Sequence, residues 1–367
     1  MIIHCQRDGL LAACQLVSQA VAARSTKTIL MNVKAIAEED RLTLVATDLE
    51  IGMRYQLVGV RVEDPGEAIL PINRLTSILR ETPDSEVAID ADERRCKVST
   101  RASEYEMPSE DPSGFPDVPE FGDAPYQELT AGVLRLLIKR TAFAAAKQDT
   151  KYSITGALWE AEDKKIRMVA TDTRRLAMAT AAATKAAAPE TKGQSHLIPV
   201  KAFLLLERTL TDDAELVKVC PRANDVLFQT EKATICTRLL EGRYPPYRDI
   251  IPKKAALKIP LAVDAFLSAV RQAAIMVDED SKRVGFTFSN GKLTLQAQGA
   301  ATGKSKVEMP LDFKGDPLTI YFDPNFVGDM LKVLDPASTI QLDLVDGQKP
   351  ALFRAGDDYV YLVMPLT

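Results

Sequence analysis

The chain has 367 residues and a mass of 40.2 kDa, and 46% of its residues are hydrophobic and 26% charged. These ordinary globular values exclude bulk disorder and a fibrous structure, and no apolar run approaches the roughly 18 residues of a membrane span. The net charge of −5 argues against a generic basic coat for nucleic acid but is compatible with a local basic surface.

The N-terminal sequence MIIHCQRDGLL lacks a basic start followed by an apolar stretch and a small-residue cleavage site, so we expect no signal peptide. The cysteines are odd in number, widely scattered and free of any CxxC spacing, which predicts buried thiols rather than a disulfide framework or a zinc site. They are Cys5, Cys14, Cys96, Cys220 and Cys236. We therefore expect a multidomain protein of a reducing compartment, the cytoplasm.

One sequence pattern occurs three times along the chain. RLTLVATDLEIGM begins at Arg41 and KIRMVATDTRRLAM at Lys165, so that Thr47 and Thr171 are 171 − 47 = 124 positions apart. A weaker third copy, KLTLQAQGAATGKS, begins at Lys292. A repeat of this length indicates duplicated domains rather than a solenoid, whose repeats are shorter.

The elements around each copy repeat as well. Helix-period segments precede the copies at 9–24, 131–148 and 263–277. A strand and a second helix follow each copy, with Pro71, Pro199 and Pro324 near the helix starts, where a missing N–H is tolerated. Alternating strand residues close each unit. Each unit is therefore predicted to be α+β and to consist of two similar halves of a helix plus strands.

Two proline-rich stretches separate the units. They are PSEDPSGFPDVPEFGDAP at 108–125 and GRYPPYRDIIPKK from Gly242, and their composition predicts extended linkers. The sequence thus predicts three tandem domains at 1–125, 126–253 and 254–367.

Three joined domains constrain what an assembly can enclose. A unit of about 122 residues is roughly 35 Å across, and head-to-tail contacts give a ring if the rotation closes. Three such units leave a hole of only ~5 Å, whereas six, from two chains, leave one about as wide as a unit. A duplex on the order of 20 Å across would pass only through the six-unit ring.

The charge distribution fits such a ring in part. The segment 131–148 contains Arg135, Lys139, Arg140 and Lys147 but no acid, and these cations would share one arc of a helix. Acidic residues instead gather in the first linker. Basic helices inside an acidic exterior would hold phosphates without regard to sequence, although a solvated helix face is the simpler alternative for any single cation.

The sequence contains no convincing catalytic motif. GAATGKS at 299–305 is one residue short of a phosphate-binding loop and precedes a strand pattern, so we predict a β-hairpin turn there. Asp48 and Asp172 follow strands, where aspartate favours turns. We expect no enzyme activity, no metal and no cofactor. Two alternatives stay open: a nucleotide-binding enzyme based on GAATGKS, and a scaffold that does not bind DNA.

The C-terminus, YVYLVMPLT, is unusually apolar for a chain end. Val360 and Leu362 would face a core by alternation, whereas Met364, Pro365 and Leu366 extend beyond the strand. Either a final strand packed on its own sheet or an adaptable partner-binding surface explains this run.

Four segments together resemble the bacterial β sliding clamp family of DNA polymerase III: TDTRRLAM, PSGFPDVPEF, GRYPPYRDIIPK and YLVMPLT. The resemblance spans the whole chain and implies three clamp domains per chain. It also implies that two chains close head to tail into a ring, with helices lining the hole and sheets outside. Such a protein is a non-catalytic, nucleoid-associated processivity factor that encircles duplex DNA.

The resemblance also implies specific sites. The family's hydrophobic partner-peptide cleft would comprise Ile154, Thr171, Thr173, Arg174, Arg175, Leu176, Pro245, Ile250, Leu362, Met364, Pro365 and Leu366. Its partners are the replicative polymerase, the clamp loader, other polymerases and repair proteins, each through a short peptide motif. The family's DNA contacts align with Arg24, Arg74, Gln148, Tyr152 and Lys201, to which the charge pattern adds Arg135, Lys139 and Lys147. The chain–chain interface would pair Tyr105 and Met107 with Ile275 and Met276.

The chain departs from the family pattern at three positions. Arg174 stands where many members have histidine, Asp249 replaces a frequent basic residue, and Thr367 ends the chain without the common basic residue. These departures bear on the peptide preference of the cleft and not on its location.

Overall fold

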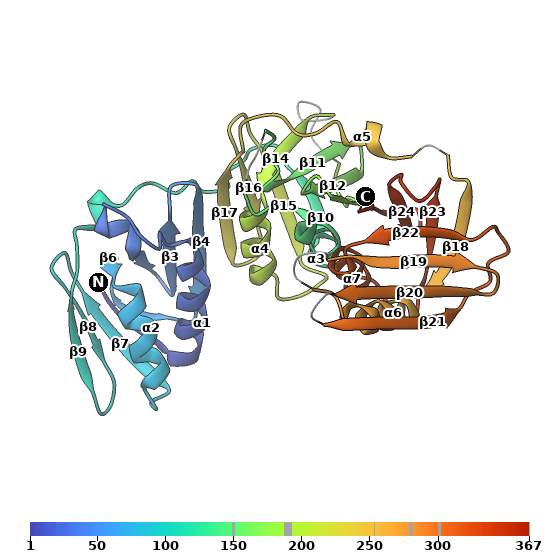
Figure 1. Ribbon diagram of the computed structural model, residues 1–367. Helices are drawn as coiled ribbons and strands as arrows, with labels where there is room; N and C mark the ends of the chain where they lie inside the picture. The colour runs from blue at the N-terminus through green and yellow to red at the C-terminus, as the bar shows by residue number, and fades with distance from the viewer. Residues whose placement is uncertain (149–150, 187–192, 253, 279–281, 300–301, 367) are drawn as a thin grey trace. The chain divides into compact units, whose positions relative to one another are not determined.

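The computed structural model describes residues 1–366 except 149–150, 187–192, 253, 279–281 and 300–301. The chain forms two compact units (Figure 1). Unit 1 contains Met1–Leu134, Ala183–Lys192 and Lys201–Leu239, and unit 2 contains Arg135–Ala182, Gly193–Val200 and Leu240–Thr367. Among the described residues, no helix has the length and apolar character needed to span a membrane.

Unit 1 contains two antiparallel sheets. The strands of the larger sheet are β2 (Val33–Glu38), β3 (Arg41–Thr47), β4 (Ile51–Val58), β6 (Gly66–Leu70), β10 (Gln127–Thr130), β15 (Leu216–Pro221), β16 (Asp225–Gln229) and β17 (Ala233–Arg238). Their order is β10-β15-β16-β17-β4-β3-β2-β6. The smaller sheet contains β1 (Ile2–Gln6), β5 (Arg61–Asp64), β7 (Glu86–Ala91), β8 (Arg95–Ser99) and β9 (Glu104–Pro108), in the order β5-β1-β7-β8-β9.

The helices of unit 1 bury one apolar stripe each. They are α1 (Arg7–Val17), α2 (Ile72–Glu81) and most of α4 (Val200–Thr209). In α2, Ile72, Leu75 and Leu79 are fully buried, the spacing of one helix face. Helices α1 and α2 lie side by side in the blue part of Figure 1, and Phe203 of α4 contacts Phe228 of β16 at 5.7 Å between ring centres.

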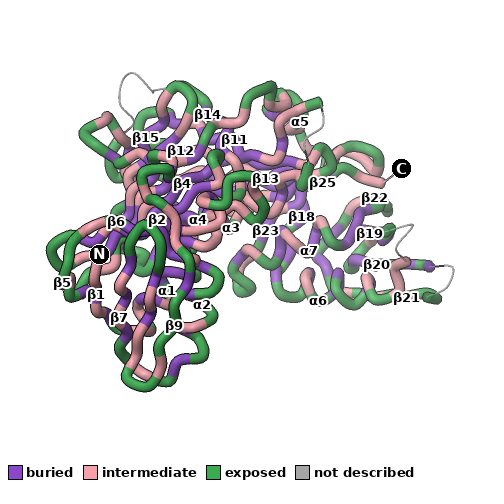
Figure 2. The backbone as a smooth tube through the Cα atoms, turned by 90° about the vertical axis from the view of Figure 1, so that its left-hand side faces the viewer, coloured by how far each residue is buried: buried purple, intermediate pink, exposed green. Residues whose placement is uncertain are grey.

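The first linker packs on unit 1 instead of extending freely. Phe115 and Val118 are buried against Val45 and Ile69, and Phe121 packs on a second apolar cluster with Cys220 and Leu227. The prediction of an extended linker is therefore wrong for these residues, because apolar side chains at intervals of three anchor an otherwise polar segment. In Figure 2 many of the exposed residues, in green, lie in the loops, whereas central strands such as β3 and β12 are largely buried.

Unit 2 repeats the arrangement. The strands of its larger sheet are β11 (Gly156–Glu162), β12 (Lys165–Thr171), β13 (Arg175–Ala182), β14 (Ser195–Pro199), β18 (Leu257–Ala262), β23 (Thr339–Leu344), β24 (Ala351–Ala355) and β25 (Tyr359–Val363). Their order is β14-β11-β12-β13-β25-β24-β23-β18. The smaller sheet contains β19 (Val284–Ser289), β20 (Lys292–Gly299), β21 (Gly303–Pro310) and β22 (Leu318–Phe322), in the order β21-β20-β19-β22.

Aromatic side chains fill the core of unit 2 between its sheets. The helices here are α5 (Tyr247–Ile250), α6 (Val263–Ala274), α7 (Pro324–Lys332) and the greater part of α3 (Ala131–Thr141). Phe266 of α6 contacts both Phe286 of β19 and Phe353 of β24, so α6 lies between the two sheets. The Asp323 carboxylate caps α7 by accepting the Asn325 N–H at 2.9 Å.

The predicted helices are confirmed, but three of them end early, among them α6, which stops at Ala274 instead of residue 277. Helix α1 stops at Val17 and α3 at Thr141, and short 3-10 turns follow at Ser18–Ala20 and Ala142–Ala144. At these ends the hydroxyls of Ser18 and Thr141 donate to carbonyl oxygens three and four residues earlier, which competes with helix continuation. Lys147 consequently lies outside the helix, and the predicted cationic arc that included it is wrong.

The cysteine prediction is confirmed, and the α+β class with it. Four cysteines are buried, Cys236 is half-buried, and none forms a disulfide. The strand pairs β4–β17 and β13–β25 each join strands of successive repeats into one continuous sheet. The middle repeat therefore contributes to both compact units, and the three domain limits stay a prediction.

Candidate functional site

The turn between β12 and β13 is built by side chains of the repeated VATD sequence. Asp172 accepts the backbone N–H groups of Arg174 and Arg175, both at 3.0 Å. Thr171 accepts the Thr173 N–H at 3.1 Å, and Thr173 has a φ of +77°, uncommon for a residue with a side chain. Asp48 binds the N–H groups of Glu50 and Ile51 in the same way. Both aspartates are therefore turn residues, as predicted.

Arg175 lies in the interior of unit 2. Its guanidinium donates to Asp172 at 3.0 Å, to Asp329 of α7 at 2.9 Å and to the Phe143 carbonyl at 2.9 Å. It also lies over the Phe326 ring, 4.6 Å from its centre, and only 11% of its side chain is exposed. Strand alternation places Arg175 on the sheet face opposite to Leu176. The guanidinium thus connects the β12–β13 turn to α7 and faces away from the outer face of the sheet.

An apolar seam runs along the outer face of the β13–β25 pair. We define this apolar seam as Leu176 and Met178 of β13 with Val360 and Leu362 of β25. Leu176 lies opposite Leu362, and Met178 lies opposite Val360. Leu176, Val360 and Leu362 share a buried cluster with Val169, Leu158 and Leu352. Met178 is absent from the predicted cleft, although the alternation of β13 would have revealed it.

The second linker crosses this face and is held by polar bonds. The Tyr244 hydroxyl donates to the Val169 carbonyl at 3.0 Å, and the Tyr247 hydroxyl donates to Glu160 at 2.8 Å. Tyr247 is also buried against the seam, so the linker is not simply extended. Pro245 is half-buried, whereas Ile250 is 44% exposed.

Glu160 anchors this linker as a carboxylate. Arg248 donates to both of its oxygens at 3.0 and 3.1 Å, and Arg167 donates to it at 2.8 Å. Burial alone would raise the pKa of Glu160, but the hydrogen bonds from Arg167, Tyr247 and Arg248 outweigh it and lower the pKa. The carboxylate is therefore ionised at neutral pH.

The C-terminal residues continue past β25 along the same unit. The Met364 N–H donates to the Arg174 carbonyl and the Leu366 N–H to the Tyr321 carbonyl, both at 2.8 Å. Met364 is 40% exposed, and Pro365 and Leu366 are half-buried. The structure thus brings the turn, the seam and the chain end together, with exposed apolar side chains at Ile250 and Met364. Ile154 is buried, and Thr367 lies outside the described residues.

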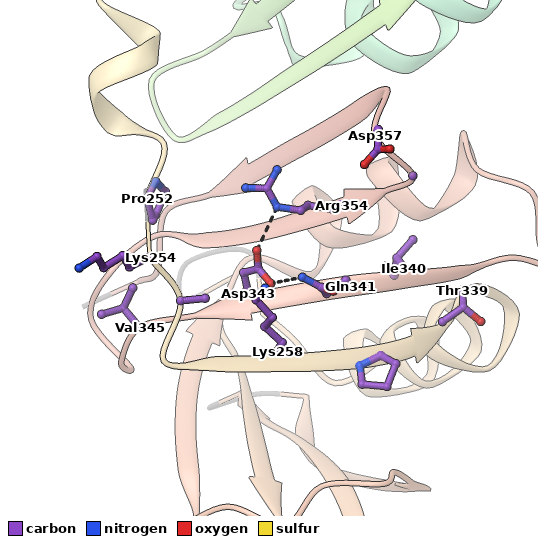
Figure 3. A pocket seen from close by; sticks show the side chains of 13 residues that line it. Pro252, Lys254, Lys258, Thr339, Ile340, Gln341, Asp343, Val345, Arg354 and Asp357 are labelled. Carbon is purple, nitrogen blue, oxygen red and sulfur yellow. Dashed lines mark hydrogen bonds and ion pairs between the residues drawn. The ribbon is translucent and has the colours of Figure 1, made fainter.

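A broad polar groove of about 1020 Å³ lies elsewhere on the outer face of the same sheet (Figure 3). Arg354 of β24 donates to Asp343 of β23 at 3.0 Å, and Gln341 donates to the other oxygen of Asp343 at 2.5 Å. The linker residues Pro252 and Lys254 border one end of this groove (Figure 3). It contains none of the predicted cleft residues.

The predicted DNA contacts lie on helices or just after them. Arg74 is on α2, Arg135 and Lys139 on α3, and Lys201 on α4. Arg24, Lys147, Gln148 and Tyr152 lie in the segments that follow the first helices. Lys201 donates to Asp48 at 2.5 Å, and Arg140 donates to Asp358 at 2.8 Å, so each of these cations already has an acidic partner. Burial by itself would raise the pKa of Asp48. The hydrogen bonds from Lys201 and from the Ile51 N–H outweigh this effect and lower the pKa.

The predicted interface residues lie at free sheet edges or beside one. Tyr105 and Met107 are on β9, the last strand of its sheet; Tyr105 is 40% exposed and Met107 is buried. Ile275 follows α6 and is 70% exposed, and Met276 is half-buried.

The region of GAATGKS is a β-hairpin, as predicted, since Gly299 of β20 pairs with Gly303 of β21. Residues 300 and 301 lie outside the described part of the chain. Within that part, no group of three or more histidine, cysteine, aspartate or glutamate side chains is placed to hold a metal ion.

Three family models match the chain in succession. They are the N-terminal domain of the DNA polymerase III beta subunit at residues 1–119, its central domain at 128–246 and its C-terminal domain at 248–367. The "Beta sliding clamp" of Pseudomonas putida is 30% identical over 370 residues, covering 98% of each chain. That of Bacillus subtilis is 26% identical over 374 residues, again covering 98% of each.

Solved structures give the same result. The crystal structure of the DNA polymerase sliding clamp from Bacillus subtilis aligns with a TM-score of 0.93 and 26% identity, covering 100% of this chain and 99% of that one. The DNA polymerase III subunit beta from Pseudomonas aeruginosa aligns with a TM-score of 0.90 and 28% identity, covering 100% of both chains.

Proposed function

We propose, because the chain belongs to the DNA polymerase III beta subunit family of sliding clamps, that two copies of it close head to tail into a ring around duplex DNA. Family membership itself gives three α+β clamp domains and a non-catalytic processivity factor of DNA replication. The ring, its contacts and the individual partners are the parts that we propose.

The observation that supports the ring is a type of strand pairing between repeats. It occurs twice within the chain, but two equivalent strands have no such partner. In each half-repeat three successive strands form a meander, and the third strand pairs with the third strand of another half-repeat: β4 with β17, and β13 with β25. The third strands β9 and β21 are sheet edges. Pairing β9 of one copy with β21 of another would complete the same antiparallel pattern.

This pairing is heterologous, because β9 and β21 belong to different ends of the chain. Two copies then pair β9 and β21 of each chain, which removes the aggregation risk of these two unpaired strands. Six repeats of roughly 35 Å enclose a hole wide enough for a duplex on the order of 20 Å across. Tyr105 and Met107 would meet Ile275 and Met276 at this contact.

The DNA is held by enclosure rather than by affinity. Helices with exposed cations, among them Arg74 and Lys139, would line the hole and exchange phosphate contacts, partly through water, while the ring slides. Lys201 contributes less net charge than its exposure implies, because its ammonium group donates a hydrogen bond to the Asp48 carboxylate.

The apolar seam with Ile250, Met364 and Leu366 is our proposed partner site. It suits short peptides with apolar anchors, from the replicative polymerase, the clamp loader, other polymerases and repair proteins. We assign Arg175 a positioning role, since its guanidinium holds the turn and α7 rather than the outer face. A polymerase bound here gains effective concentration at the primer end without new chemistry. The protein would work in the cytoplasm, at the nucleoid.

Sedimentation equilibrium combined with small-angle scattering tests the ring. We expect twice the chain mass of 40.2 kDa and an envelope with a central opening. A compact single-chain particle without an opening would overturn the proposal. A dimer without an opening would favour a scaffold that does not enclose DNA.

Removal of residues 364–367 tests the partner site. The deletion leaves β25 intact, so the dimer should persist while stimulation of the polymerase is lost. Met364→Ser should weaken stimulation, whereas Val58→Ser, at an apolar residue of β4 that is 67% exposed, serves as its matched control and should not. Full stimulation by the deletion variant would reject this site.

A further inference from the structure

We propose that the polar groove of Figure 3 continues the proposed partner site and binds acidic residues beside the apolar anchor of a partner peptide, with Arg354 selecting them. This inference rests on the proposed function, because the groove receives a peptide only if the apolar seam anchors it. Three observations support it: the groove adjoins the seam, cations line it, and the chain covers the equivalent face of unit 1 with its own extended segment.

The groove begins one strand beyond the apolar seam. Two rows of cross-strand neighbours run from the seam into the groove on the outer face of the sheet. One row is Leu176, Leu362, Leu352, Asp343 and Lys258, and the other is Met178, Val360, Arg354, Gln341 and Pro260. Both rows are apolar at β13 and β25 and polar at β23. An extended peptide that crosses the strands would therefore pass from apolar to polar contacts.

The sheet geometry also sets the spacing between anchor and acid. Neighbouring strands lie about 4.8 Å apart, so Arg354 is about 5 Å and Lys258 about 14 Å across the sheet from β25. An extended chain advances about 3.3 Å per residue. An acidic residue about two to four positions from an apolar anchor thus reaches these cations.

Arg354 is held in place by a buried carboxylate. Asp343, which is 8% exposed, accepts the Arg354 Nε–H at 3.0 Å and the Gln341 amide at 2.5 Å. The two terminal nitrogens of Arg354 point away from Asp343 (Figure 3), and 38% of the arginine side chain is exposed. A guanidinium fixed in this way offers two N–H groups side by side, the arrangement that binds a carboxylate with two hydrogen bonds.

Two exposed lysines extend this cationic surface. Lys254 borders the linker end of the groove, and Lys258 of β18 lies opposite Asp343. Both oxygens of Asp343 are already bonded, so Lys258 keeps its charge for an incoming group. The other acid of the lining, Asp357, lies toward the opposite end (Figure 3). The end of the groove near the second linker is therefore positively charged.

Unit 1 contains an equivalent face. The first residues of β15 and β23 lie opposite the residues that directly precede α3 and α6, respectively. Cys220 and Asp343, each the fifth residue of its strand, therefore hold equivalent positions. Their neighbours on the next strand, Leu227 and Leu352, correspond in the same way.

The first linker covers this face of unit 1 as an extended segment. Val118 packs on Gly52 of β4, and Phe121 packs on Leu227 of β16 and Cys220 of β15. The linker thus crosses from β4 to β16, about 10 Å, within 121 − 118 = 3 positions. A peptide that crosses the seam of unit 2 toward the groove would follow the same path.

The second linker leaves the groove open, because it is held on the other side of the seam. Tyr244 bonds the Val169 carbonyl of β12, and Tyr247 bonds Glu160 of β11. The covered face of unit 1 is apolar where the groove is polar, since Asp343 takes the place of Cys220. The occupant of the groove therefore differs from the first linker in chemistry, with acidic residues in place of the aromatic ring.

Selection from a random peptide library tests this preference. Phage-displayed peptides of about 12 residues are selected against the full-length wild type. We expect apolar anchors, with aspartate or glutamate two to four positions away at least about threefold more frequent than in the starting library, because hydrogen bonds to charged groups are strong.

Groove variants should change the selected acids and not the anchors. Lys254→Glu with Lys258→Glu should remove the acidic preference, and so should Arg354→Gln at the position nearest to the anchor. The matched control is Lys164→Glu with Lys165→Glu, the same charge change at exposed lysines outside the groove. It should select the same peptides as the wild type.

One selected peptide then measures the contact by fluorescence anisotropy. The wild type should bind it roughly 10-fold more tightly than its analogue with glutamine in place of the acid. Arg354→Gln should bind the two forms about equally, and Arg354→Lys, which keeps the charge but not the fork, should lie between. Unchanged affinity for the neutral analogue shows that the variants are folded.

The outcomes separate the groove from the partner site itself. If the wild type selects no apolar anchors, or selects the same ones as a chain without residues 364–367, the proposed partner site is overturned. Apolar anchors without an acidic preference overturn the groove alone. An acidic preference that survives all three groove variants also overturns it.

Discussion

At the scale of single residues, the VATD pattern and the family resemblance differ in what they could predict. The VATD pattern correctly predicted that Asp48 and Asp172 are turn residues, because an aspartate after a strand binds the N–H groups that follow it. The neighbouring Arg175 was predicted as part of the cleft from resemblance alone. Its position on the inner face depends on Asp329 and Phe143, which are distant in sequence, and no local pattern shows such partners.

Replacing Arg175 tests its positioning role. Arg175→Met leaves Asp172 and Asp329 without their shared partner and should destabilise unit 2 by about 3 kcal/mol, as when one member of a buried ion pair is removed. Trp159, the single tryptophan of the chain, is buried in β11 and reports unfolding of this unit by fluorescence in urea. Arg174→Met, at the exposed neighbour, is the control and should change the free energy of unfolding by less than about 0.5 kcal/mol. Equal effects would refute the assignment.

Glu160 makes the stability of unit 2 depend on pH. Because its pKa is lower in the folded protein than its ordinary value of 4.5, the unfolded state binds the proton more tightly. The stabilisation is thus fully present above about pH 4.5 and is lost as the pH falls through the lower folded pKa. Glu160→Gln should lower the free energy of unfolding by about 1 kcal/mol at pH 7, and this difference should shrink at pH 3. Urea unfolding followed by Trp159 fluorescence at both pH values measures the free energy of unfolding of the two proteins. If the difference between wild type and variant does not change with pH, the role of the ionised carboxylate is contradicted.

At the scale of elements, the order of helices and strands was predictable, but their ends and the two linkers were not. Helix α1 ends at Val17 because the Ser18 hydroxyl bonds the Gln15 carbonyl, a local competition that periodicity does not reveal. The first linker has a disordered composition, yet Val118 is buried where Gly52 leaves room for it. A Cβ on Gly52 would lie 2.7 Å from a Val118 methyl group. Such complementarity emerges only when both segments are in place.

Loss of this contact should release the first linker. Val118→Asp places a charge in an apolar site and should detach the segment that covers Cys220, which is 2% exposed. We expect modification of Cys220 by a thiol reagent to accelerate at least about tenfold, since a thiol must be exposed to react. Asp117→Ala, one residue earlier and exposed, is the control. An unchanged labelling rate in the valine variant would show that the linker does not protect this site.

At the scale of the whole molecule, the threefold repeat identified the architecture before any side chain was placed. The sequence does not show that the third strand of each meander pairs with another third strand, because strand partners far apart in the chain leave no local signal. Once β4–β17 and β13–β25 are known, the unpaired third strands β9 and β21 support the second copy that we propose. The residues of the partner site follow the same rule, since Leu176 and Leu362 meet only through such a pair.

Release from linearised DNA tests enclosure most directly. The protein is loaded onto a nicked circular plasmid by the clamp loader that we propose as its partner, and the complex is isolated by gel filtration. The protein on the DNA is counted before and after a restriction enzyme cuts the plasmid once. If the protein encloses the DNA, it stays on the circle and slides off the free ends within minutes of cutting. Retention on the linear product at the level of the uncut circle would mean that affinity, and not topology, holds the protein on DNA.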